Sequence, residues 1–189
     1  MKKIFWSLFG VLLGILVLHL WQRVEVRITF DLPECKSEED KITGCVAKEY
    51  YESGEVFREV PLKNGVIDGV TKEYYKSGKI LRELLHKNGV GEGISKEYYE
   101  NGNLKAEVTY HNGKANGMSK MYYENGGLWR ELPLKDFMLD GVFKEYSQDG
   151  NLIATLTFQN HQFVHGECVN GKALQEENIQ RDNIQKACE

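Results

Sequence analysis

The stretch KEYYESGEVFREV, residues 48–60, decides the fold because it returns four more times along the chain. It recurs as KEYYKSGKILREL from Lys72, KEYYENGNLKAEV from Lys96, KMYYENGGLWREL from Lys120 and KEYSQDGNLIATL from Lys144. The interval is 24 residues each time, without drift. Self-similarity at a fixed period of this size is the signature of a repeat architecture. The sequence therefore predicts a row of equal structural units.

Each unit carries the signal of a β-hairpin. Two short β-prone runs flank a turn dipeptide in every copy: Ser53-Gly54, Ser77-Gly78, Asn101-Gly102, Asn125-Gly126 and Asp149-Gly150. Asn-Gly or Asp-Gly between such runs is the strongest short-range hairpin signal. A two-residue turn would place Tyr51 opposite Val56, Tyr50 opposite Phe57, Glu49 opposite Arg58 and Lys48 opposite Glu59.

The charges support this register. The expected neighbours form six opposite-charge pairs and no like-charge pair, which cross-strand energetics favour. The pairs are Glu49–Arg58, Lys48–Glu59, Glu73–Arg82, Lys72–Glu83, Lys96–Glu107 and Lys120–Glu131. Exposed pairs contribute at most about 1 kcal/mol each, so they determine register more than stability.

Side-chain alternation sorts the residues by face. One face should carry Tyr51 and its equivalents beside a regular apolar column. The other should carry Tyr50, Tyr74, Tyr98, Tyr122 and Tyr146, with the variable partners Phe57, Leu81, Lys105, Trp129 and Ile153. No long amphipathic helix is present in this region to cover either face. We expect an all-β fold: an elongated, single-layer antiparallel sheet of tandem 24-residue hairpins, a solenoid and not a closed barrel.

The unit G-x-x-K-E-Y-Y-x-x-G-x-L, followed by N-G and another Gly, resembles the bacterial variant of the MORN (membrane occupation and recognition nexus) repeat. The resemblance covers residues 44–171, including a degenerate sixth start, HGECVNGK, at residues 165–172. It implies an extended hairpin array used for binding and scaffolding, and bacterial relatives are often labelled antitoxins. Departures from the motif are Cys45 after Gly44, Phe137 in place of a turn Gly, and Ser147 in place of the second Tyr.

The first residues form a membrane signal. Residues 4–21 read IFWSLFGVLLGILVLHLW, without a formal charge, after Lys2 and Lys3. A helix of this length spans roughly 27 Å, enough for a thin bilayer. A cleaved signal peptide would end in small residues, whereas HLWQRV follows here, so we favour an uncleaved transmembrane anchor. The positive-inside rule places residue 1 in the cytoplasm and exports the rest, and secretion after cleavage is the alternative.

Composition excludes one large class of partner. The 189 residues carry a net charge of −4, and residues 1–23 hold Lys2, Lys3 and Arg23 but no acid, so the remainder is more acidic still. An acidic body without a basic patch makes nucleic-acid binding improbable. We expect an anchor or signal at residues 1–23, an N-terminal cap at 24–43, repeats at 44–171, and a C-terminal cap or short helix at 172–189.

The cysteines lie only at the ends of the repeats. An even number of cysteines in an exported chain indicates disulfides, and four allow three connectivities. We favour pairing within each end, so that each bond closes a short loop and stabilises one cap. Four free thiols would require a cytoplasmic domain. The favoured pairs are Cys35 with Cys45 and Cys168 with Cys188.

No catalytic motif of the hydrolase, P-loop, zincin or redox type occurs, so we expect neither an enzyme nor a cofactor. His161, His165 and Cys168 are the only cluster with metal-ligand types, and surface histidines beside a disulfide explain it better. The predicted function is a membrane-anchored, extracytoplasmic module that binds a protein or cell-envelope polymer. A protein that neutralises one toxin is the alternative.

Aromatic rings are the best candidates for the partner-binding surface, because large rigid rings dominate interface hot spots. Packing between neighbouring repeats is the competing interpretation of the same rings. The candidates are Tyr50, Phe57, Tyr74, Tyr98, Tyr122, Trp129 and Tyr146, with Trp129 at their centre.

Overall fold

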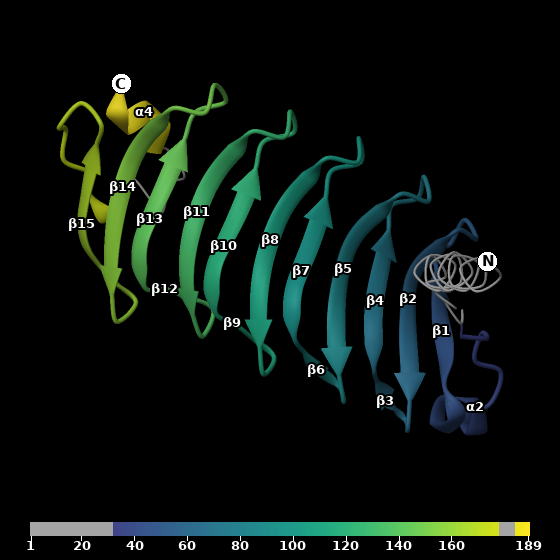
Figure 1. The fold of residues 1–189 in the computed structure, drawn as a ribbon. Helices are drawn as coiled ribbons and strands as arrows, with labels where there is room; N and C mark the ends of the chain where they lie inside the picture. The colour runs from purple at the N-terminus through teal and green to yellow at the C-terminus, as the bar shows by residue number, and fades with distance from the viewer. Residues whose placement is uncertain (1–31, 178–183) are drawn as a thin grey trace, which may run out of the picture. The chain divides into compact units, whose positions relative to one another are not determined.

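The computed structural model describes residues 32–177 and 184–189. Residues Leu32–Glu189 form one compact unit. Its strands lie side by side in a single open sheet, and each bends along its length (Figure 1). The sheet has 15 strands, and those on its main path follow one another in chain order. The expected single-layer antiparallel repeat fold is confirmed.

Each repeat contributes two long strands, and each of the first four adds one two-residue strand. The outgoing strands are β1 (Cys45–Tyr50), β4 (Gly69–Tyr74), β7 (Gly93–Tyr98), β10 (Gly117–Tyr122) and β13 (Gly141–Tyr146). The return strands are β2 (Val56–Lys63), β5 (Ile80–Lys87), β8 (Leu104–His111), β11 (Leu128–Lys135) and β14 (Leu152–Gln159). The short strands are β3 (Val66–Ile67), β6 (Val90–Gly91), β9 (Lys114–Ala115) and β12 (Met138–Leu139). β15 (Gln162–Cys168) ends the sheet, and the helices are α2 (Glu38–Thr43) and α4 (Ile184–Cys188).

The predicted charge register is correct in every hairpin that it covered. Lys48 pairs with Glu59 and Glu49 with Arg58, and the equivalent residues pair in the next three hairpins. The same charges also pair between repeats: Arg58 lies opposite Glu73, and Glu59 lies opposite Lys72. Strands β2, β4 and β5 therefore have opposite charges on both sides, which favours in-register stacking of the repeats.

The predicted two-residue turn is wrong. Tyr51 N–H donates to the Glu55 carbonyl and Gly54 N–H donates to the Tyr51 carbonyl, which leaves three residues in the loop. Gly54 has a φ of +100°, as the last residue of this loop type requires. Tyr50 consequently pairs with Val56, not Phe57, and a β-bulge restores the register before Glu49–Arg58. The two deviations cancel, which is why the charge pairs were predicted correctly.

Two sets of hydrogen bonds connect successive repeats. At one end, the second tyrosine of a repeat donates its hydroxyl to a backbone carbonyl of the next repeat: Tyr51 to Tyr74 at 2.6 Å and Tyr75 to Tyr98 at 2.7 Å. At the other end, the turn amide of the second, third and fourth repeats donates to the preceding repeat, as Gly89 does to Ile67 at 2.7 Å. These bonds satisfy backbone groups that lie beyond the paired parts of the strands.

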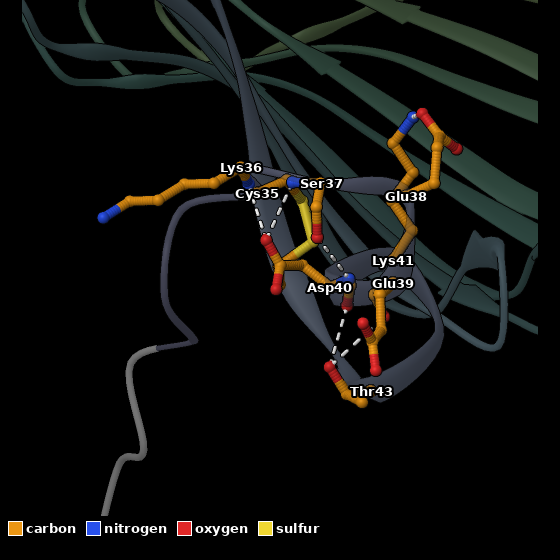
Figure 2. The surroundings of a disulfide bond; sticks show 9 residues. Cys35, Lys36, Ser37, Glu38, Glu39, Asp40, Lys41 and Thr43 are labelled. Carbon is orange, nitrogen blue, oxygen red and sulfur yellow. Dashed lines mark hydrogen bonds and ion pairs between the residues drawn. A yellow bond between two sulfur atoms is a disulfide. The ribbon is translucent and has the colours of Figure 1, made fainter.

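The N-terminal cap supplies what a preceding repeat would supply. Gly65 N–H donates to the carbonyl of Lys41 in α2, in the place where Gly89 donates to Ile67. A capping box begins this helix, since Ser37 Oγ accepts from Asp40 N–H and the Asp40 carboxylate accepts from Ser37 N–H (Figure 2). A further hydrogen bond from Lys36 N–H helps to hold the pKa of Asp40 below its ordinary value. The Cys35–Cys45 disulfide ties this cap to β1.

The C-terminal cap contains the main apolar core. A cluster of seven buried residues gathers on β13, β14, β15 and the tail: Phe143, Ala154, Leu156, Phe158, Cys168, Leu174 and Ile184. Ile184 belongs to α4, which packs on β14. The Cys168–Cys188 disulfide joins β15 to α4. Both predicted disulfide pairings are confirmed. The segment expected to be a C-terminal cap or short helix contains α4.

The transmembrane helix predicted at residues 4–21 lies outside the described residues. Among residues 32–177 and 184–189, no helix is long and apolar enough to cross a membrane.

Candidate functional site

The alternation of the strands gives the sheet two chemically different faces. The lysine face carries Lys48, Lys72, Lys96, Lys120 and Lys144 with the glutamates that pair with them. The arginine face carries Arg58, Arg82 and Arg130 with Glu49, Glu73, Glu97 and Glu145. Ion pairs form on both, for example Lys48–Glu59 at 3.2 Å and Arg82–Glu73 at 2.9 Å.

The polar groups of the lysine face satisfy one another. The first tyrosine of a repeat donates its hydroxyl to the glutamate of the repeat before it, as Tyr74 does to Glu59 at 2.7 Å and Tyr146 to Glu131 at 3.0 Å. This hydrogen bond, together with Lys48, holds the pKa of Glu59 below its ordinary value. Burial and the neighbouring carboxylate raise the pKa of Tyr74. These tyrosine hydroxyls therefore form a structural ladder across the repeats.

An exposed aliphatic row follows the same face. Val70, Ile94, Met118 and Val142 occupy one position of successive repeats and are 44% to 55% exposed. They lie two residues before the lysines, so alternation places them on the lysine face. The row is an apolar strip on a face that is otherwise lined by lysine–glutamate pairs and tyrosine hydroxyls.

The arginine face is more deeply buried along its middle. Thr71, Ser95 and Ser119 occupy one repeat position and are 5%, 8% and 3% exposed. In the fifth repeat the same position holds Phe143, which belongs to the C-terminal core. The small hydroxyl residues leave room between the first and third repeats, and a cavity of about 130 Å³ opens there. Its lining consists of Arg58, Thr71, Glu73, Arg82, Leu84, His86, Ser95 and Tyr110.

Two arginines approach one carboxylate in this cavity, and they do so unequally. Arg82 Nη2 donates to Glu73 at 2.9 Å, and this hydrogen bond raises the pKa of the Arg82 guanidinium. Arg58 stays 3.8 Å from both Glu73 and Glu49, beyond hydrogen-bonding distance. Arg58 Nε is buried and has no hydrogen-bond partner among the described residues. The cavity thus contains a cation whose donors are not all used.

The seven aromatic candidates do not form one row. Tyr50, Tyr74, Tyr98, Tyr122 and Tyr146 lie on the lysine face. Phe57 instead packs on the second tyrosine, Tyr51, with ring centroids 5.2 Å apart. Trp129 does the same with Tyr123 at 5.6 Å, and the Arg130 guanidinium lies 4.0 Å from its ring centroid. The bulge causes this division, because it moves the Phe57 position away from the first tyrosine. The role of these rings in docking stays a prediction.

The cluster of metal-ligand residue types, His161, His165 and Cys168, lacks a free cysteine in the folded chain. The Cys168 sulfur is bonded to Cys188, so it is not a thiolate ligand. Among the described residues, no group of three or more ligand-type side chains is placed to hold a metal ion.

Sequence reasoning missed the cavity on the arginine face. Its signal was the column Thr71, Ser95, Ser119, Phe143, in which small hydroxyl residues give way to a large ring. The unequal pairing of Arg58 and Arg82 could not be foreseen, because both face glutamates in the sequence register.

The repeats match the MORN repeat variant over residues 46–64, 67–88, 91–112, 115–136 and 139–160. The first matched segment begins in β1 and the other four begin in the two-residue strands, and each ends at the turn after its return strand. A search of curated proteins finds no relative that matches this chain.

Proposed function

Because the chain belongs to the MORN repeat variant family, we propose that it is a non-enzymatic, membrane-anchored interaction module outside the cytoplasm, whose sheet docks a protein partner. MORN repeats suggest a module for protein or membrane interaction. The anchor, the compartment and the protein nature of the partner are the parts that we add.

The observation that carries this proposal is that helices pack on the two end regions of the sheet, while exposed apolar groups and a cavity lie between them. α2 packs on β2 and α4 packs on β14, at the two ends of the strand order. In between, the lysine face exposes its aliphatic row and the arginine face opens a cavity. Repeated exposed apolar groups on an otherwise polar surface are typical of interaction sites. The two disulfides support an oxidising compartment, since such bonds are rare in the cytosol.

Two methionines of β10 allow a matched test of docking. Met118 is 46% exposed on the lysine face, and Met121, three residues on, lies opposite Arg130 on the arginine face. A photoreactive residue is placed at one position at a time, and intact cells are irradiated. We expect one protein adduct to depend on the position used. The absence of any position-dependent protein adduct would contradict the docking function.

Protease added outside an intact cytoplasmic membrane tests the compartment. We expect digestion of the repeats, with a fragment containing residues 4–21 left in the membrane. A cytoplasmic protein serves as the control for membrane integrity. Full protection of the repeats would contradict export, and a mature N-terminus near residue 22 would identify a cleaved signal instead of an anchor.

A further inference from the structure

The guanidinium of Arg58 differs from the other arginines of its face. Arg82 and Arg130 each hold a carboxylate at 2.9 Å, whereas Arg58 lies 3.8 Å from its two glutamates. Its side chain is 33% exposed, and its Nε is buried without a hydrogen-bond partner among the described residues. Because Nε is closed to solvent, a ligand would meet the two Nη groups, which make no hydrogen bond to the described residues. Two such donors beside a cavity suit bidentate recognition of a planar anion.

The hydrogen bonding around the cavity leaves room for one more carboxylate. Its lining contains two guanidinium groups, Arg58 and Arg82, and one carboxylate, Glu73. Glu73 is already hydrogen-bonded to Arg82. Arg58 has Glu49 and Glu73 within 3.8 Å but donates a hydrogen bond to neither, so a single additional carboxylate could accept from it without displacing the Arg82–Glu73 pair. A phosphate dianion would bring excess negative charge next to Glu73, and no lysine lines the cavity to balance it.

The size of the cavity sets the kind of ligand. Small-molecule sites usually measure about 300–1,000 Å³, and this cavity measures about 130 Å³. It accommodates the end of one side chain, not a cofactor or a nucleotide. Thr71 and Ser95 form a small polar floor, and Tyr110 adds a hydroxyl that has no hydrogen bond to the described residues.

Among the described repeats, an arginine without a hydrogen-bonded carboxylate beside a cavity occurs at one place. At the junction of repeats two and three, Glu97 lies opposite Arg82 and is already paired with Lys105. At the junction of repeats three and four, Ala106 takes the arginine position beside Met121 and Glu97, so no second arginine is available there. At the junction of repeats four and five, Arg130 and Glu145 form a closed ion pair, 14% and 4% exposed. A ligand that needs an open guanidinium therefore has one defined position on an otherwise periodic sheet, and this position would fix the register of a bound partner.

We propose that the Arg58 cavity binds one aspartate or glutamate carboxylate of a protein partner docked on the arginine face. The proposal rests on the docking function and specifies the chemistry of the partner. Docking on the lysine face alone, seen as adducts at Met118 but not at Met121, would overturn it.

Acetate is the direct probe of this chemistry. The full chain in detergent micelles is titrated at pH 7 and constant ionic strength, and its amide and arginine Nε–H resonances are followed by NMR. We expect saturable shifts at Arg58, Thr71 and Ser95 with acetate, and none with acetamide, which has the same shape without the charge. No saturable shift with acetate would overturn the proposal. Tighter binding of inorganic phosphate at the same resonances would also overturn it.

Three variants distinguish recognition of acetate by the guanidinium from attraction by a positive charge alone. We expect Arg58→Gln to weaken acetate binding by at least about tenfold, and Arg58→Lys to fall between it and the unmodified protein, because lysine keeps the charge but lacks the fork. Lys72→Gln removes the same charge from the opposite face and should change binding less than about twofold. Equal acetate binding by Arg58→Gln and the unmodified protein would overturn the proposal, and Arg58→Lys tests it even if Arg58→Gln does not fold.

The acetate experiment is independent of cellular location. It uses purified protein, so failure of the protease or crosslinking tests leaves its outcome interpretable. Conversely, a partner captured at Met121 together with absent acetate binding would leave the docking function in place and reject the carboxylate cavity alone.

Discussion

At the scale of the residue, the paired tyrosines of the repeat have two separate tasks. The first reaches back to a glutamate of the preceding repeat, and the second reaches forward to a backbone carbonyl of the next. In the fifth repeat Ser147 replaces the second tyrosine, where no further tyrosine pair follows. Its hydroxyl accepts a hydrogen bond from Asn151 N–H within its own turn instead. The departure from the motif thus marks the end of the array.

The forward bond can be tested by removing one hydroxyl. We expect Tyr75→Phe to lower the free energy of unfolding by about 1 kcal/mol, because the partly buried Tyr98 carbonyl loses its donor. Tyr50→Phe is the matched control. The Tyr50 hydroxyl donates to Glu34 at 3.2 Å, and Tyr50 is 52% exposed, so water can replace this bond. The control should cost less than half as much. Denaturant unfolding followed by circular dichroism measures both free energies. Equal costs would mean that the forward bond of the second tyrosine does not stabilise the contact between repeats.

At the scale of the element, the sequence determined the hairpins but not their turns. Periodicity and charge were sufficient for strand order and for the pairing of Glu49 with Arg58, because a wrong register would place like charges together. The same data fit a two-residue turn, since the bulge near Phe57 compensates for the extra loop residue. Distinguishing the two required the backbone hydrogen bonds, above all the one from Tyr51 N–H to the Glu55 carbonyl. The division of the aromatic candidates between two groups follows from the extra loop residue and the bulge that compensates for it.

The glycine of the loop gives the corresponding prediction. Gly78 has a φ of +80°, and a Cβ added there would meet no atom within 4 Å. Any cost of Gly78→Ala therefore comes from the left-handed backbone, and we expect about 1–2 kcal/mol of lost stability. Ser77→Ala in the same loop should cost less than about 0.5 kcal/mol. If both variants unfold at the same denaturant concentration as the original protein, the three-residue loop is wrong.

At the scale of the whole described unit, stability depends on contacts between neighbours. Apart from the core beneath the C-terminal cap, each repeat contacts the repeats beside it, as expected of a solenoid. Sequence reasoning identified the ends from the positions of the cysteines. It could not identify the arginine-face cavity, which exists because small side chains at Thr71 and Ser95 come together from separate repeats.

The caps therefore give a prediction about where unfolding begins. In a solenoid, losing one cap should expose the adjacent repeat first and leave distant repeats protected. Closing loops of 10 and 20 residues contributes about 3 kcal/mol each in the chain-entropy description. We expect Cys168→Ser with Cys188→Ser to lose amide-exchange protection in β13, β14 and β15 while β1 and β2 are unchanged. Cys35→Ser with Cys45→Ser should give the reverse pattern and serves as the control.

Because Cys168 belongs to the apolar core and α2 buries no residue, loss of the C-terminal disulfide should lower stability more than loss of the N-terminal one. Equal loss of protection in all strands after either change would instead mean that the sheet unfolds as one cooperative unit.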